Sequence, residues 1–254
     1  MTSATRPPET GGLPETDGLP ETAPALTVTL LGTGTSTGVP VIGCRCAVCT
    51  SDDPRDARLR TSAHVVAHTA AGDVHLQVDA GPDFRTQALR AGLTAVDALL
   101  VTHEHFDHIT GLDDLRPFFF HERSPVPVFA SEGTAEALGA MFRYIFDRTY
   151  PGASVLDLCP VRAPFVVASR TAPGARVQVV PLWAPHGSFT VMGFRIGTFG
   201  YLTDAGAVPP AARAALAEAG VSPAAARRRP PAPARRRPAA PRPAGRRRRS
   251  GRRA

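Results

Sequence analysis

The residues best equipped for chemistry lie in THEHFDH, residues 102–108. This segment places His103, His105, Asp107 and His108 within six positions, directly after an apolar run. On a strand that leads into a helix, His103 and His105 can point to one side, and Asp107 and His108 follow on the first helical turn. Imidazole nitrogens and carboxylate oxygens suit zinc, iron or manganese. The segment therefore predicts two neighbouring sets of metal ligands.

A second cluster, CRCAVC at residues 44–49, holds three of the four cysteines. Four cysteines are too few for a disulfide scaffold, and three thiols at this spacing are typical of a metal site. A structural zinc site wants four ligands. Cys44, Cys46 and Cys49 supply three, and we expect Cys159 to be an inert thiol.

The motif at 103–108 matches in full the signature H-x-H-x-D-H, and the chain resembles the metallo-β-lactamase superfamily over about residues 26 to 220. The resemblance implies an αββα sandwich of the α/β class. It implies that His103, His105 and His186 (in WAPHG) hold one ion, that Asp107 and His108 hold part of a second, and that Asp204 (in GYLTDAG) bridges both. A hydroxide shared by the two ions would attack the substrate, with Asp107 as the residue that orients it.

Four further segments resemble the branch that includes phosphoribosyl cyclic phosphate phosphodiesterases: LLGTGTSTGVPVIGCRCAVC, VDAGPDFR, GLDDLRPF and FGYLTDAG. That branch implies hydrolysis of a small cyclic phosphodiester, two divalent ions (Zn or Mn) in the active site, and one structural zinc held by the three clustered cysteines. Asp79, at a strand end in VDAGPDFR, is the candidate partner for a ligating histidine.

The segments around these motifs alternate between strand-like and helix-like patterns, which favours a layered α/β domain at 25–220. Strands are expected at 26–32, 64–69, 74–79, 97–103, 126–130, 176–182, 189–197 and 199–203. Helices are expected at 83–91, 107–117, 132–142 and 209–219. We expect His64, His68 and His75 to be ordinary sheet residues.

The charge of the chain is divided unevenly. All 29 basic residues are Arg, and 13 of them lie after residue 222, where no acidic residue occurs, so residues 1–222 carry 16 − 22 = −6. Residues 1–24 read as a disordered Pro/Thr/Glu leader and residues 221–254 as a disordered Arg/Pro/Ala tail. Without an apolar run of 18 residues or a signal peptide, we expect a cytoplasmic protein with no membrane partner.

The resembled branch carries histidines near its C-terminus that complete both metal sites, whereas no His follows His186 here. Arg, Pro, Ala and Gly are the residues whose codons begin with two G or C bases. We therefore expect the tail to be an out-of-frame product, the fold to lack its last strand and helix, and the enzyme to be impaired. A genuine tail would instead bind nucleic acid through phosphates.

Other readings of the chain stay open. Two are enzymes of the same superfamily, a quinone-cofactor biosynthesis hydrolase and a tRNA 3′-end nuclease. A third is an Arg-tailed nucleic-acid-binding protein on a degraded hydrolase domain. A homodimer is also compatible with the sequence.

Overall fold

The computed structural model describes residues 23–147, 149 and 155–220. Nearly all of the expected leader, and the whole expected tail at 221–254, lie outside the described residues. Within the described part of the chain, no helix is long and apolar enough to cross a membrane.

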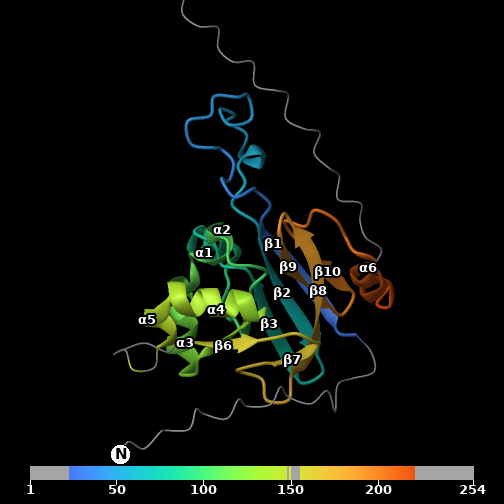
Figure 1. Ribbon diagram of the computed structural model, residues 1–254. Helices are drawn as coiled ribbons and strands as arrows, with labels where there is room; N and C mark the ends of the chain where they lie inside the picture. The colour runs from blue at the N-terminus through green and yellow to red at the C-terminus, as the bar shows by residue number, and fades with distance from the viewer. Residues whose placement is uncertain (1–22, 148, 150–154, 221–254) are drawn as a thin grey trace, which may run out of the picture. The chain divides into compact units, whose positions relative to one another are not determined.

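Two β-sheets form the centre of the domain (Figure 1). The first sheet has six strands in sequence order; β1 to β3 pair antiparallel, and β3 to β6 pair parallel. Its strands are β1 (Ala25–Gly32), β2 (Ser62–Thr69), β3 (Gly72–Val78), β4 (Ala98–Leu100), β5 (Val126–Ala130) and β6 (Leu156–Pro160). The second sheet is antiparallel, in the order β10 (Phe199–Tyr201), β9 (Phe189–Ile196), β8 (Arg176–His186) and β7 (Phe165–Ala168).

Short helices cover the outer faces of both sheets (Figure 1). The first sheet is flanked by α1 (Phe84–Ala91), α2 (Phe106–Ile109), η2 (Leu112–Leu115), α3 (Arg116–Glu122), α4 (Glu132–Met141) and α5 (Arg143–Phe146). Helix α6 (Pro210–Ala217) packs on β8 of the second sheet, and η1 (Pro54–Asp56) lies in the loop after β1. The order of layers is helix, sheet, sheet, helix, so the αββα arrangement expected from the sequence is confirmed.

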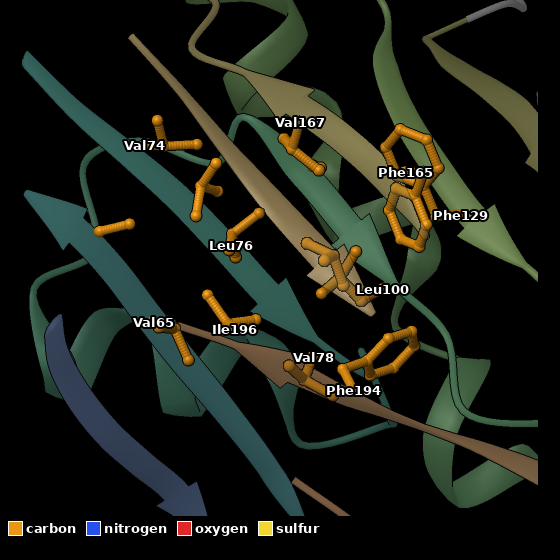
Figure 2. Close-up of a cluster of buried hydrophobic side chains, with 14 of the residues drawn as sticks. Val65, Val74, Leu76, Val78, Leu100, Phe129, Phe165, Val167, Phe194 and Ile196 are labelled. Atoms are coloured by element: carbon orange, nitrogen blue, oxygen red, sulfur yellow. The ribbon is translucent and has the colours of Figure 1, made fainter. Parts of the chain in front are cut away.

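The inner faces of the two sheets bury a shared apolar core (Figure 2). Alternation along β2 and β3 sends Val65, Leu76 and Val78 into this core, where they meet Phe194 and Ile196 of β9. A second core lies between the first sheet and its helices. Burying these side chains stabilises the fold by removing apolar surface from water, and it fixes the strand ends that carry the polar motifs.

The expected helix at 107–117 was wrong in its continuity, because the chain forms α2, η2 and α3 there. Gly111 separates α2 from η2, and a Cβ at Gly111 would collide with the carbonyl oxygen of Gly81. Pro117 lies in the first turn of α3, where its missing N–H costs nothing. Strands β6 and β7 were not expected, and β8 continues to His186, beyond the expected end at 182.

The sandwich is open along β1. Val28 and Leu30 pair with Val65 and Ala63, which are fully buried in the core between the sheets. Yet Val28 is 36% and Leu30 is 57% exposed. Among the described residues, no strand of the second sheet continues beyond the three-residue β10 to cover them.

Candidate metal centre and active site

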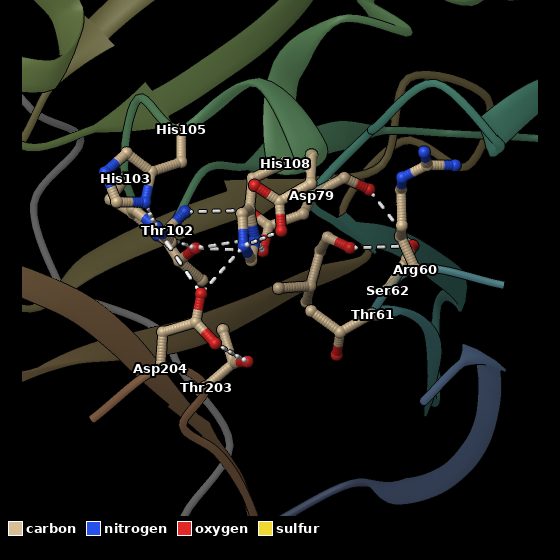
Figure 3. A network of polar contacts seen from close by, with 12 residues as sticks. Arg60, Thr61, Ser62, Asp79, Thr102, His103, His105, His108, Thr203 and Asp204 are labelled. Carbon is tan, nitrogen blue, oxygen red and sulfur yellow. Dashed lines mark hydrogen bonds and ion pairs between the residues drawn. The ribbon is translucent and has the colours of Figure 1, made fainter. Parts of the chain in front are cut away.

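Four segments meet at one end of the sandwich and bring the predicted site residues together. Figure 3 shows Asp79, His103, His105, His108 and Asp204 from three of these segments. Asp79 follows β3, the motif at 103–108 follows β4, His186 ends β8, and Asp204 follows β10. The backbone oxygen of Thr102 accepts a hydrogen bond from the N–H of Met192 at 2.9 Å, which ties the motif to the second sheet. The two sheets therefore position one site between them.

His103, His105 and His186 form the first donor set. Each offers one ring nitrogen, and these atoms all lie within 4.8 Å of one another. Nε2 of His103 is 3.0 Å from Nδ1 of His105. Three imidazoles at this separation are a ligand set suited to a divalent transition metal.

His103, His108 and Asp204 form a second donor set, again within 4.8 Å of one another. Oδ2 of Asp204 is 3.0 Å from Nε2 of His108 and 3.6 Å from Nε2 of His103. Asp107 borders this set, with its Oδ2 at 3.3 Å from Nε2 of His108. The two sets adjoin each other and share His103, whose ring offers one nitrogen to the site.

Asp79 belongs to neither donor set, but it is hydrogen-bonded to histidines of both, directly or through Thr102. The side chain is fully buried; Oδ2 is 2.7 Å from Nδ1 of His108 and accepts a hydrogen bond of 2.9 Å from the Thr102 hydroxyl. Oγ1 of Thr102 is in turn 3.0 Å from Nδ1 of His103. In this network Nδ1 of both histidines donates, which orients both Nε2 atoms toward the site. An Nε2 atom that gives up its proton offers its lone pair to a metal ion.

Charge in the site is arranged to attract a cation. Burial disfavours protonation of His108. The negative charges of Asp79 and Asp107, together with the hydrogen bonds that His108 donates to Asp79 and Asp204, outweigh burial and raise the pKa of His108 to about 10. Burial, together with the neighbouring His108, lowers the pKa of His103 to about 4. The hydrogen bond with His108 lowers the pKa of Asp204. Three carboxylates thus surround one imidazole, and a metal cation satisfies the same excess of negative charge.

The backbone around the site is tightly constrained. Asp79 and Asp204 both have a φ of 55°, in the left-handed region that non-glycine residues rarely adopt. The N–H of Ala80 donates to the carbonyl of His108 at 2.8 Å, and a Cβ at Gly81 would collide with the carbonyl oxygen of Asp107. The turn after β3 therefore packs backbone against backbone on α2.

Cys44, Cys46 and Cys49 converge in the loop between β1 and β2, with their sulfur atoms within 4.8 Å of one another. Hydrogen bonds from the backbone N–H of Cys49 and from the neighbouring thiols lower the pKa of Cys46 to about 7. Thiolate is the form that binds metal. No His, Asp or Glu among the described residues joins these three thiols.

The three histidines expected to be ordinary sheet residues are hydrogen-bonded within the first sheet. His64 contacts His75 at 3.3 Å and Gln77 at 3.4 Å, and His68 contacts Asp73 at 2.9 Å. Two residues of the site were missed from sequence: Thr102, which joins Asp79 to His103, and Phe189, whose ring lies beside three of the histidines. Only the position of Thr102 directly before the motif gave a signal.

Residues 75–229, more than half of the chain, match the family described as "Beta-lactamase superfamily domain". A crystal structure described as a new diphosphatase from the PhnP family is 40% identical, with a TM-score of 0.64; the match covers 75% of this chain and 69% of that one.

Two curated proteins are also similar. An octanoyltransferase from Porphyromonas gingivalis is 44% identical over 178 residues, which are 69% of this chain and 34% of that protein. A coenzyme PQQ synthesis protein B from Methylobacterium radiotolerans is 29% identical over 198 residues, which are 70% of this chain and 62% of that protein. The chain thus spans less than two thirds of the length of either curated relative.

Proposed function

This chain belongs to the beta-lactamase superfamily, and we propose that it is a metal-dependent hydrolase that cleaves a small, cyclic phosphodiester. The observation that carries the proposal is the pair of donor sets that share His103. Similarity to a diphosphatase of the PhnP family supports a phosphorus-centred substrate.

We assign the proposed ligands as follows. His103, His105 and His186 would hold one ion, and His108 with Asp107 the other, with Asp204 between them. When bound, two divalent ions, zinc or manganese, would activate a water molecule and offset the charge that develops on the phosphoryl oxygens. Because the second set has only one imidazole of its own, we expect its ion to bind more weakly and the activity to be impaired.

Asp107 is the proposed catalytic residue. Its carboxylate borders the second donor set, and Gly81 and α2 hold its backbone in place. From this position it can accept a hydrogen bond from the attacking water, align the lone pair of that water on phosphorus, and receive the proton. Asp79 and Thr102 keep the lone pairs of His103 and His108 directed into the site throughout.

The proposal is tested with protein saturated with zinc or manganese. We expect hydrolysis of bis(p-nitrophenyl) phosphate and of a cyclic nucleotide, and Asp107→Asn should reduce kcat by about 10²–10⁴. The matched control is Asp113→Asn, which changes a half-buried carboxylate of η2 that pairs with Arg116. Full occupancy of both metal sites without hydrolysis of any diester would overturn the proposal.

We also propose a structural zinc at Cys44, Cys46 and Cys49, supported by the close approach of their sulfur atoms. Cys46→Ser should lower the zinc content by about one equivalent per chain, as measured by mass spectrometry of the metal. Cys159→Ser, which alters a cysteine of β6, is the control and should leave the zinc content unchanged.

The similarity to coenzyme PQQ synthesis protein B favours a second candidate, a hydrolase of quinone-cofactor biosynthesis.

For the Arg-rich segment at 221–254 we keep two alternative proposals. It is either an out-of-frame product or a nucleic-acid-binding arm. RNA binding that weakens steeply with salt would support the arm. A cytoplasmic location and a homodimer also stay predictions.

A further inference from the structure

The hairpin of β8 and β9 places an aromatic ring beside the candidate metal centre. His186 and Phe189 are the last pair of its register, joined by a two-residue turn at Gly187 and Ser188. Gly187 has a φ of 59°, which such tight turns require. Directly paired residues project to the same face of a sheet. The turn therefore fixes Phe189 on the same side as a proposed metal ligand.

The ring of Phe189 contacts all three histidines of the first donor set. Its centroid lies 4.8 Å from that of His186, 5.2 Å from that of His105 and 6.1 Å from that of His103. It meets His105 and His186 nearly at right angles, at 79° and 81°. The ring of Phe189 thus lines one side of the first donor set.

This ring is not needed to fill the interior. Phe189 belongs to none of the three apolar cores formed by the described residues, and it is 36% exposed. The site opens on the same side, because His105 is exposed whereas His103 and His108 are buried. Phe106, directly after His105, is 68% exposed. Exposed phenyl groups beside a polar site suit contact with an apolar part of a ligand.

We propose that Phe189 selects phosphoesters whose organic group is a planar ring, such as an aryl or nucleoside ester, over alkyl phosphoesters. This inference rests on the proposed phosphoester chemistry and names its substrate class. The donor sets would bind the phosphoryl group, and the exposed part of the Phe189 ring would pack against the planar group attached to it. Aromatic side chains stack in the same way on any nucleic-acid base, because every base has a flat π-face.

The first experiment measures binding and does not need turnover. Dissociation constants of phenyl phosphate and methyl phosphate are measured by calorimetry on the full chain loaded with zinc. The wild type should bind phenyl phosphate about tenfold more tightly. Phe189→Ala should remove most of this ratio, and Phe189→Tyr should keep it. Phe120→Ala, which removes an exposed phenyl ring from α3, is the matched control and should keep the full ratio.

Each outcome decides between a selective role and a structural one. Equal affinity of the wild type for the two phosphates, or no binding of either, overturns the inference. So does a Phe189→Ala protein that loses zinc and binds both phosphates equally weakly, because Phe189 would then only support its neighbouring histidines. Selective binding of phenyl phosphate without hydrolysis of any diester supports the inference and overturns the proposed function.

Discussion

At the scale of single residues, Asp79 organises the site without being one of its proposed ligands. One buried carboxylate accepts from Nδ1 of His108 and, through Thr102, determines which nitrogen of His103 is free. The left-handed backbone of Asp79 carries a conformational cost that the hydrogen bonds from Thr102 and His108 offset. Loss of a supporting residue of this kind typically weakens metal binding by about 10- to 100-fold.

We expect Asp79→Asn to weaken zinc binding at the active site by about 10- to 100-fold. An amide of the same shape offers one acceptor and no charge, so it cannot serve both Thr102 and His108 as the carboxylate does. Zinc affinity is measured by competition with a chromophoric chelator. Asp73→Asn, which changes an exposed carboxylate bonded to His68, is the control. Equal zinc affinities in all three proteins would contradict this role of Asp79.

At the scale of elements, β2 and β3 hold a buried histidine whose protonation opposes folding. Burial, and then the proximity of His75, lower the pKa of His64 to about 4. In the unfolded chain the pKa is near 6.5, so between these two values the unfolded state binds a proton that the folded state does not. The free energy of unfolding therefore falls as the pH drops from about 6.5 to about 4, and His64 contributes no pH dependence above that window.

The expected size of this effect is about 2–3 kcal/mol at pH 4.5. His64→Gln removes the titrating group. Between pH 7 and pH 4.5, the free energy of unfolding of this variant should therefore fall by about 2–3 kcal/mol less than that of the wild type. Urea unfolding is measured at both pH values with a chelator present, which keeps metal loss out of the comparison. His68→Gln, on the exposed part of β2, is the control. A parallel fall in wild type and His64→Gln would refute the prediction.

The turn between β3 and α1 gives a second test at this scale. Gly81→Ala should destabilise the fold by about 1–3 kcal/mol, because the added methyl group would push the backbone of α2 away from β3. Gly133→Ala is the matched control: Gly133 lies in α4 with nothing near its Cβ position, and alanine should stabilise that helix by about 0.5–1 kcal/mol. Urea unfolding of both variants checks the opposite signs.

At the scale of the whole domain, aromatic contacts hold the two sheets together. Phe129 of β5 stacks on Phe165 of β7, with ring centroids 4.4 Å apart and planes 21° from parallel (Figure 2). Phe165 is almost fully buried in the core between the sheets. The same core carries the strand ends that hold the site, so packing far from the metal centre controls its geometry.

Phe165→Ala should lower the free energy of unfolding by about 3–5 kcal/mol, because it leaves a cavity between the sheets. The loss is measured by urea unfolding at neutral pH. Phe120→Ala, which truncates an exposed ring of α3, should change stability by less than about 0.5 kcal/mol. Similar losses in the two variants would show that Phe165 does not anchor the sandwich.

From the sequence, the resemblance to the metallo-β-lactamase superfamily implied the αββα class and all nine proposed metal ligands, and residue patterns predicted most strands and helices. The motif at 103–108 and the cysteine cluster are contiguous, and apolar periodicity marks strands such as 26–32 and 74–79. The sequence did not predict β6 and β7, because both strands are short and β6 mixes polar with apolar residues. It also did not show that the helix at 107–117 breaks, because the break depends on the close approach of Gly111 to Gly81.

Only the tertiary structure decided which atoms meet. Asp204 lies 3.0 Å from His108, Asp79 bonds to His108 and to Thr102, and Phe189 faces His103, His105 and His186. These contacts join residues up to 96 positions apart. They depend on the packing of two sheets against each other, and no local propensity encodes that distance. The sequence thus predicted which residues are candidate donors, whereas the sharing of His103 between two donor sets is a property of the packed sandwich.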